Sequence, residues 1–305
     1  RAAHALALQR LRDAVTNARD TRVLAHPTDA FLPFLAAPTS AALVIEPQHF
    51  TAGLRSYLLL PQLLRRPGSA EWVDLPSAQE VADFSYEADA CRHCPGCSCD
   101  RHLAHAHACY SSSKKKIRDR HELVKAARAS AIREAGYDDI KVEPRLNTTS
   151  QRRADVFYAD RSAYVEIHHY TDDVVVHPLC DSNIDAESVD PLATISKAEK
   201  TKASAYVHVL DEARSASAVT SGLRTVSYTT CSYTSLGALG EGTVKCLSAA
   251  VGFLKKREVM AARTSPRADG LSPQRLAASF RFRTRCTLQA ALMRGNGLLA
   301  AEVGL

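Results

Sequence analysis

Cysteine and histidine residues gather in one short stretch of the chain. Five of the nine cysteines lie between Cys91 and Cys109. A secreted disulfide framework would spread its cysteines over the fold, so this cluster favours a metal site in a reducing compartment. Tetrahedral zinc needs four thiolate or imidazole ligands, which Cys94, Cys97, His105 and Cys109 supply in short paired spacings. We therefore predict a structural Zn²⁺ knuckle, with Cys91 as an alternative ligand. Other donors in this stretch also stay open: His93, Cys99, His102 and His107.

A second set of residues suited to chemistry is acidic. Asp155 begins a short stretch typical of a β-strand, Glu166 lies on the next such stretch, and Asp172 and Asp173 follow it. Nucleases that use a divalent ion need two or three carboxylates converging on it, and acids at the ends of neighbouring strands meet that need. Lysines on the following helix could orient the attacking water: Lys197, Lys200 and Lys202. Such a set could form a catalytic Mg²⁺ site, but the spacing alone does not establish one, because a single acid at a turn is more often only solvated.

One acidic pattern resembles a polymerase motif. Tyr170-Thr171-Asp172-Asp173 matches the Y-x-D-D box of reverse transcriptases. A four-residue pattern arises often by chance, and nothing upstream resembles the rest of a polymerase palm. We therefore reject a polymerase active site at this position.

The segment between Lys114 and Arg153 is strongly basic. It holds 12 Lys and Arg against six Asp and Glu, a surplus equal to the +6 of the whole chain. Beside a zinc knuckle, such a stretch is a plausible phosphate-binding surface, although alone it could be a solvated helix face. We predict that it contacts DNA or RNA through these residues: Lys114, Lys115, Lys116, Arg118, Arg120, Arg152 and Arg153.

Periodicity and turn residues predict the elements that position these groups. The expected helices are Arg118–Ala135, Ala193–Ala205, 243–260 and about 272–295, and the expected strands are Ile140–Glu143, Ala154–Tyr158, Tyr164–Ile167 with an extension to Val176, Tyr206–Leu210 and Thr225–Tyr228. Alternation of this kind indicates an α/β fold with one small mixed sheet flanked by helices.

Length and composition set the remaining limits. The 305 residues are 46% hydrophobic and 24% charged, which is typical of a globular chain. No apolar run approaches the roughly 20 residues of a membrane span, so we expect no membrane partner and an intracellular protein. Because the chain begins with Arg, we interpret it as part of a longer polypeptide. We predict a helical arm over 1–85, a knuckle over 86–113 and an α/β domain over 114–305.

Taken in order, several short motifs resemble the C-terminal region of non-LTR (LINE-type) retrotransposon polyproteins. In that family, one such motif precedes the CCHC knuckle and another ends it. The remaining motifs follow the knuckle, up to the end of the last domain. The matching segments are Phe50–Pro61, His105-Ala-His-Ala-Cys109, Arg120-His121-Glu-Leu-Val124, Glu143-Pro144, Arg153-Ala-Asp155, Asp173-Val-Val-Val-His177-Pro178 and Ala291-Leu-Met-Arg-Gly-Asn296. The ordered series is more specific than any single motif.

The resemblance implies a restriction-endonuclease-like fold of the PD-(D/E)XK type. In that family this domain nicks target DNA, so that reverse transcription is primed on the exposed 3′ end. The resemblance assigns Asp155 as the first acid, Asp173 as the second and Lys202 as the lysine, with Glu166 and Lys200 as alternatives. It also implies a nuclear protein within a larger polyprotein. The alternatives are a domesticated, non-catalytic subunit of a ribonucleoprotein, in an organelle for instance, and a zinc-stabilised protein-interaction module.

Overall fold

The computed structural model describes most of the chain after residue 108 and little before it. The described residues are 64–65, 72–73, 107, 109–146, 151–161, 165–178, 180, 183, 186, 190, 192–221, 224–264 and 271–302. The predicted helical arm and most of the predicted knuckle lie outside these residues, apart from β1 (Leu64–Arg65), which pairs with β2 (Trp72–Val73). No helix in the described part of the chain is long and apolar enough to span a bilayer.

A four-stranded mixed sheet forms the centre of the described fold. Its strands are β3 (Asp138–Val142), β4 (Val156–Asp160), β5 (Glu166–Val176) and β6 (Arg224–Thr234), in spatial order β3-β4-β5-β6. The first three strands pair antiparallel, whereas β5 and β6 run parallel over their full length. A parallel pair needs a long crossover, which the helix between β5 and β6 provides. The predicted α/β class with a small mixed sheet is therefore confirmed.

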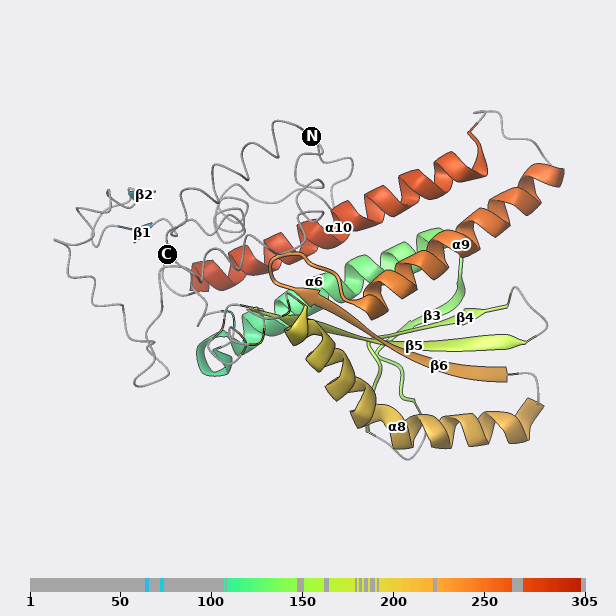
Figure 1. The fold of residues 1–305 in the computed structure, drawn as a ribbon, viewed down its shortest axis with the longest axis horizontal. Coiled ribbons are helices and arrows are strands. Elements are labelled where there is room, and N and C mark those ends of the chain that lie inside the picture. The colour runs from blue at the N-terminus through green and yellow to red at the C-terminus, as the bar shows by residue number, and fades with distance from the viewer. Residues whose placement is uncertain are drawn as a thin grey trace.

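Helices cover both faces of the sheet (Figure 1). One face carries α6 (Tyr110–Ala135) and α9 (Glu241–Thr264), and α10 (Pro273–Glu302) packs against both. Among the described residues, the opposite face carries only α8 (Ala193–Ser221). Helix α6 ends where predicted, because Gly136 adopts a φ of 94° that side chains rarely tolerate.

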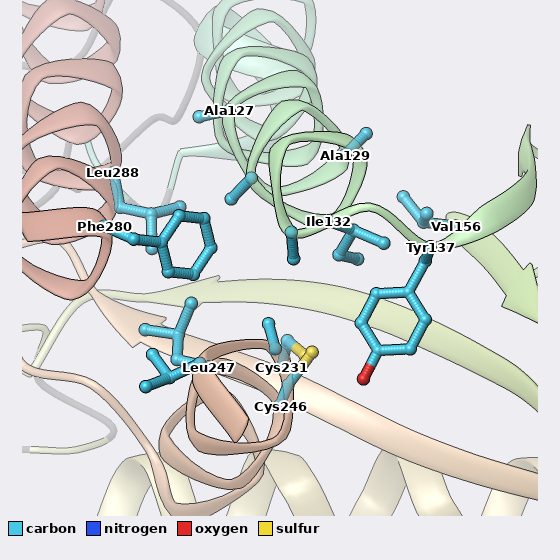
Figure 2. Packing of buried hydrophobic residues seen from close by; sticks show 14 of the residues in the cluster. Ala127, Ala129, Ile132, Tyr137, Val156, Cys231, Cys246, Leu247, Phe280 and Leu288 are labelled. Atoms are coloured by element: carbon cyan, nitrogen blue, oxygen red, sulfur yellow. The ribbon is translucent and has the colours of Figure 1, made fainter. Parts of the chain in front are cut away.

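The larger of two apolar cores lies under α6, α9 and α10 (Figure 2). Ile132 of α6, Leu247 of α9 and Phe280 of α10 converge on the sheet, where Val156 and Cys231 meet them. A smaller core under α8 joins residues of that helix to the sheet: Leu146, Ala154, Tyr206, Leu210 and Val226. Because both faces of the sheet are buried, the register of each strand determines which side chains face α6 and α9 and which face α8.

Two of the differences between the predicted and the observed elements change the description of the fold. The predicted strand Tyr206–Leu210 is wrong, because these residues continue α8. Its apolar Tyr206 and Leu210 are buried four positions apart while Val207 is exposed, which is the pattern of a helix face. Helix α6 also begins eight residues before the predicted Arg118, so the domain boundary predicted after residue 113 lies inside a helix.

Candidate functional site

Asp155 occupies the end of the sheet, directly before β4. Its carboxylate accepts a hydrogen bond from the backbone amide of Asp173 at 2.5 Å and one from Nε2 of His121 on α6 at 3.1 Å. Burial alone would raise the pKa of Asp155, but the hydrogen bonds from His121 and from Asp172 outweigh it and hold that pKa well below its usual value. The surroundings of Asp155 therefore favour its charged form.

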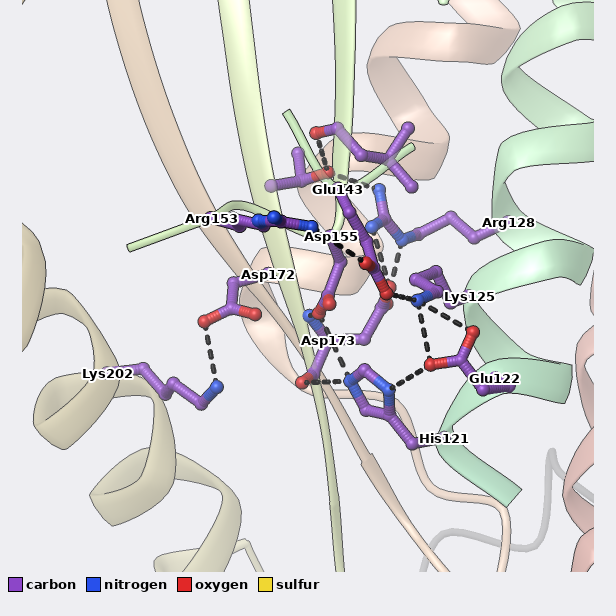
Figure 3. A network of polar contacts seen from close by, with 12 residues as sticks. His121, Glu122, Lys125, Arg128, Glu143, Arg153, Asp155, Asp172, Asp173 and Lys202 are labelled. Atoms are coloured by element: carbon purple, nitrogen blue, oxygen red, sulfur yellow. Dashed lines mark hydrogen bonds and ion pairs between the residues drawn. The ribbon is translucent and has the colours of Figure 1, made fainter. Parts of the chain in front are cut away.

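Asp172 and Asp173 point to opposite faces of β5, because successive side chains of a strand alternate (Figure 3). Asp172 faces α8, where Nζ of Lys202 lies 2.8 Å from its Oδ2 and the Tyr228 hydroxyl lies 3.4 Å from the same atom. Sequence reasoning placed Asp173 beside Asp155 as the second acid. In the structure it is the Asp172 carboxyl, and not that of Asp173, whose pKa is coupled to that of Asp155.

Asp173 instead forms a buried ion pair with Arg128 of α6. Arg128 donates from Nε and from its terminal nitrogen to the two carboxylate oxygens, each at 2.7 Å, and both side chains have no exposed surface. The Tyr233 hydroxyl donates a third bond to Asp173 at 3.1 Å. Burial disfavours the charge of Arg128, yet attraction to Asp173 outweighs it and raises the pKa of Arg128 further. This pair joins α6 to the sheet, and its carboxylate is fully occupied.

The carboxyls of Asp155 and Asp172 form a coupled pair. Burial and the hydrogen bond to Asp155 raise the pKa of Asp172 to about 6, although Lys202 acts in the opposite direction. Two carboxyls held this close cannot both ionise without cost, so one proton is shared between them. A cation at this position would remove that cost.

His121 completes the group from the α6 side. Its Nε2 lies 3.1 Å from Oδ2 of Asp155 and 3.1 Å from the backbone carbonyl oxygen of Asp173. Burial alone would lower its pKa, but the hydrogen bond to Asp155 and the charge of Asp155 outweigh it and raise the pKa of His121 to about 8. In the sequence, His121 stands out only as part of a short motif, because nothing local links it to an acid 34 residues away.

A pocket of about 890 Å³ opens onto this group of residues. Its lining includes Asp173 to Val175 of β5, His121 of α6 and Lys202 of α8. Its further lining comes from the first turns of α6: Lys114, Lys115, Ile117, Arg118 and Arg120. The pocket is therefore rich in positive charge and includes His121 and Lys202, which pair with Asp155 and Asp172.

Several predicted residues lie apart from this pocket. Glu166 is six residues before Asp172 on β5, roughly 20 Å away at 3.3 Å per residue, and it binds Arg161 and Arg224. Lys200 is exposed on α8, about 200° around the helix from Lys202.

The predicted basic residues divide into surface and buried groups. Lys116 lies on α6 between the pocket-lining Lys115 and Arg118. Arg152 donates to the Ala205 carbonyl and covers the Tyr206 ring, and Arg153 pairs with Glu143 at 3.6 Å. Both arginines are exposed on the segment that leads to Asp155.

Arg120 was predicted to contact nucleic acid, but only 2% of it is exposed. It donates to Nδ1 of His107 at 2.9 Å and to Oδ1 of Asn296 at 3.2 Å. The His107 ring also stacks on His177, with ring centroids 4.4 Å apart. Arg120 thus connects the start of α6 to α10, so its guanidinium is committed to the interior rather than to a surface contact.

The predicted zinc ligands lie largely outside the described residues. Cys91, Cys94, Cys97 and His105 are in that part of the chain, whereas Cys109 is described and buried. Among the described residues, no three His, Cys, Asp or Glu side chains gather as a metal-binding group. A magnesium site at Asp155 would therefore need backbone or solvent oxygens besides its two carboxylates.

Comparison of the chain with known protein families and with curated proteins found no match.

Proposed function

We propose that this chain is a metal-dependent endonuclease module that binds DNA and hydrolyses one strand with Mg²⁺. The observation that carries the proposal is the ion pair of Asp172, whose carboxyl is coupled to that of Asp155, with Lys202, which lines a cationic pocket. The order helix, three strands, helix, strand around a mixed sheet is compatible with the restriction-endonuclease-like fold expected from the resemblance. We extend the proposal to Asp172, rather than Asp173, as the second acid.

The donor atoms at this position fit a magnesium ion. Mg²⁺ prefers oxygen ligands and is usually held by one or two carboxylates, with water and substrate phosphate completing its shell. Asp155, directly before β4, and Asp172 and the Asp173 carbonyl oxygen, within β5, supply oxygen ligands from adjacent strands. When bound, the ion would polarise a phosphodiester and stabilise the negative charge that develops on it. The shared proton of the carboxyl pair supports this assignment, because a divalent ion would favour full ionisation of both groups.

Lys202 would act on the reacting groups from the α8 side. Its side chain is 37% exposed, so its ammonium contacts Asp172 and is also open to the pocket. From there it can donate to a phosphate oxygen or orient a water molecule toward phosphorus. Its contact with Asp172 also ties the position of the ammonium to the carboxylate pair.

DNA would be held by the positive charge around the pocket. Lys114, Lys115 and Arg118 of α6 and Lys202 of α8 all line it. Cations in such an arrangement bind the phosphate backbone without reading sequence. By the resemblance, a nick made here would provide the 3′ end for target-primed reverse transcription.

Nicking of supercoiled plasmid tests the proposal. In Mg²⁺ or Mn²⁺ the protein is expected to convert the plasmid to the open circle. Asp155→Ala, Asp172→Ala and Lys202→Ala should each reduce the rate by roughly 100-fold or more. Lys200→Ala is the matched control, since it removes the same charge from the same helix but away from the pocket, and its rate should equal that of the wild type.

Binding measurements separate this proposal from its alternatives. Replacing Lys114, Lys115 and Arg118 by Ala should weaken DNA binding and lower the salt dependence by about 0.9 for each lost phosphate contact. Salt-sensitive binding without metal-dependent nicking would favour the non-catalytic ribonucleoprotein subunit. Absence of affinity at low salt would leave the zinc-stabilised protein-interaction module.

A further inference from the structure

The first half of α10 presents an aromatic ring and several arginines to solvent. Phe282 is 50% exposed, whereas phenylalanine is more often found in the core. Arg281 and Arg283 flank it in the sequence and are exposed, and Arg285 is partly exposed on the next turn. Over its 30 residues, α10 holds five arginines and a single acid, Glu302. This part of the helix is therefore both cationic and aromatic.

Arg281 and Arg285 form a pair of like charges without an acidic partner. They are four residues apart, so their side chains lie on the same face of the helix. Among the described residues, no acid lies within ion-pair distance of either, whereas Arg283 pairs with Glu134 of α6. Like charges at this spacing destabilise a helix, and an anion bound between them would remove that cost.

Helix α9 adds a further cation at the end of α6. Arg257 covers Gly136 so closely that a Cβ atom there would clash with its guanidinium, which also contacts Glu258 at 3.2 Å. Two residues before Gly136, Glu134 holds Arg283 of α10. Both helices thus place an arginine at the end of α6. We call the following set the α10 surface: Arg257, Arg281, Phe282, Arg283 and Arg285.

The α10 surface lies away from the pocket of the proposed nuclease site. The pocket is lined by the first turns of α6, whereas Arg283 contacts the last turn of that helix. From Arg118 to Glu134 the helix axis extends roughly 24 Å, at 1.5 Å per residue. In Figure 1 the first turns of α6 lie toward the left, and the end of α6 and the start of α10 lie toward the right.

We propose that the α10 surface is a second nucleic-acid contact, which binds a single strand of DNA or RNA. The faces of the bases are open in a single strand and hidden in a duplex, so an exposed aromatic ring can stack only on the former. Guanidinium groups beside the ring bind phosphate oxygens and can also stack on bases. The proposal goes beyond the nuclease function, because it needs neither the metal ion nor the acidic residues.

The combination of ring and charge favours a single strand over other occupants. An apolar protein partner would bury Phe282 but would also cover guanidinium groups that then lack partners, which costs free energy. A duplex would contact the arginines through its phosphates and leave the ring in solvent. A single strand satisfies both kinds of group at once.

Fluorescence anisotropy tests the proposal with labelled oligothymidylate, oligouridylate and a DNA duplex, without added divalent ions. The protein carries Lys114→Ala, Lys115→Ala and Arg118→Ala, so that the pocket contributes little to binding. On this background, Phe282→Leu should weaken single-strand binding by roughly 5- to 150-fold, the range expected for one stacked base. Phe282→Tyr keeps the ring and should bind as tightly as its parent.

Charge substitutions test the arginines separately. Replacing Arg281 and Arg285 together by Ala should weaken single-strand binding and reduce its salt dependence. Arg214→Ala is the matched control, because Arg214 is exposed on α8, on the opposite face of the sheet, and pairs with Asp211. This control should leave single-strand affinity unchanged. A loss seen with only one of the two oligonucleotides would assign the α10 surface to DNA or to RNA.

Cross-linking uses the unaltered protein and so does not depend on the folding of a variant. A strand that contains 5-iodouracil should cross-link to Phe282, as identified by mass spectrometry. The proposal is overturned if no single-strand binding remains on the substituted background, if Phe282→Leu binds like its parent, or if cross-links form only at the pocket. Plasmid nicking does not involve the α10 surface, so any of these results would leave the proposed nuclease function standing.

Discussion

Asp172 and Asp173 are adjacent in sequence, yet the structure gives them opposite roles, and isosteric substitution should separate the two. Asp173→Asn removes the charge that balances a fully buried Arg128. Breaking a buried ion pair from one side costs about 3–5 kcal/mol, because the remaining charge stays without compensation. For a domain of this size that corresponds to a drop of roughly 6–20 °C in melting temperature.

Asp172→Asn should behave differently. The asparagine amide can donate to Asp155 in place of the shared proton, and the repulsion within the carboxyl pair disappears. We therefore expect the free energy of unfolding to stay unchanged or to rise, although Lys202 loses its charged partner. The same substitution should abolish Mn²⁺ binding, whereas Asp173→Asn should keep it, because Asp173 contributes only its backbone carbonyl.

Urea unfolding followed by circular dichroism, combined with Mn²⁺ titration of the folded variants, measures both effects. The reasoning is refuted if Asp173→Asn unfolds at the same urea concentration as the wild type. It is also refuted if Asp173→Asn loses metal binding while Asp172→Asn retains it.

Three further outcomes follow from other contacts. The pKa of Asp172 is raised from 3.8 to about 6, so between these pH values the folded protein keeps a proton that the unfolded chain releases. The free energy of unfolding of the wild type, relative to that of Asp172→Asn, should therefore fall by up to about 3 kcal/mol as the pH rises from 4 to 7. An equal pH dependence of the two free energies over that range would contradict this. A Cβ at Gly295 would lie 2.4 Å from Cγ of Arg120, so Gly295→Ala should lower the free energy of unfolding by about 1–3 kcal/mol in urea titrations. Metal analysis should find one Zn²⁺ per chain, lost in Cys97→Ser and in Cys109→Ser, and retention in both would reject these ligands.

Much of the sheet and its helices follows from local sequence. Gly136 marks the end of α6, and the β-branched and aromatic residues of β4 and β5 mark those strands. The exception is Tyr206–Leu210, whose apolar residues suit a strand equally well. Only the packing of Tyr206 and Leu210 against the sheet shows that this segment belongs to a helix. Short apolar runs of this kind carry no period of their own.

The site was harder to predict because it depends on strand register. Whether Asp172 or Asp173 faces Asp155 changes with a shift of one residue, and the pairing of β5 with β4 and β6 sets it. His121 and Arg128 reach the acids only through the packing of α6 on the sheet. The sequence could therefore indicate which residue types form the site, but not that Asp172 faces α8 and Asp173 faces α6.

The packing of β6 and α10 also sets when the acidic residues of the site can be aligned during synthesis. Tyr228 and Tyr233 of β6 support Asp172 and Asp173, and Asn296 near the end of α10 holds Arg120 at the start of α6. Roughly 120 residues separate the acids from that last contact, which takes a ribosome roughly 6 to 25 s at 5–20 residues per second. A nascent chain therefore carries its acids for many seconds before the contacts that align them are complete.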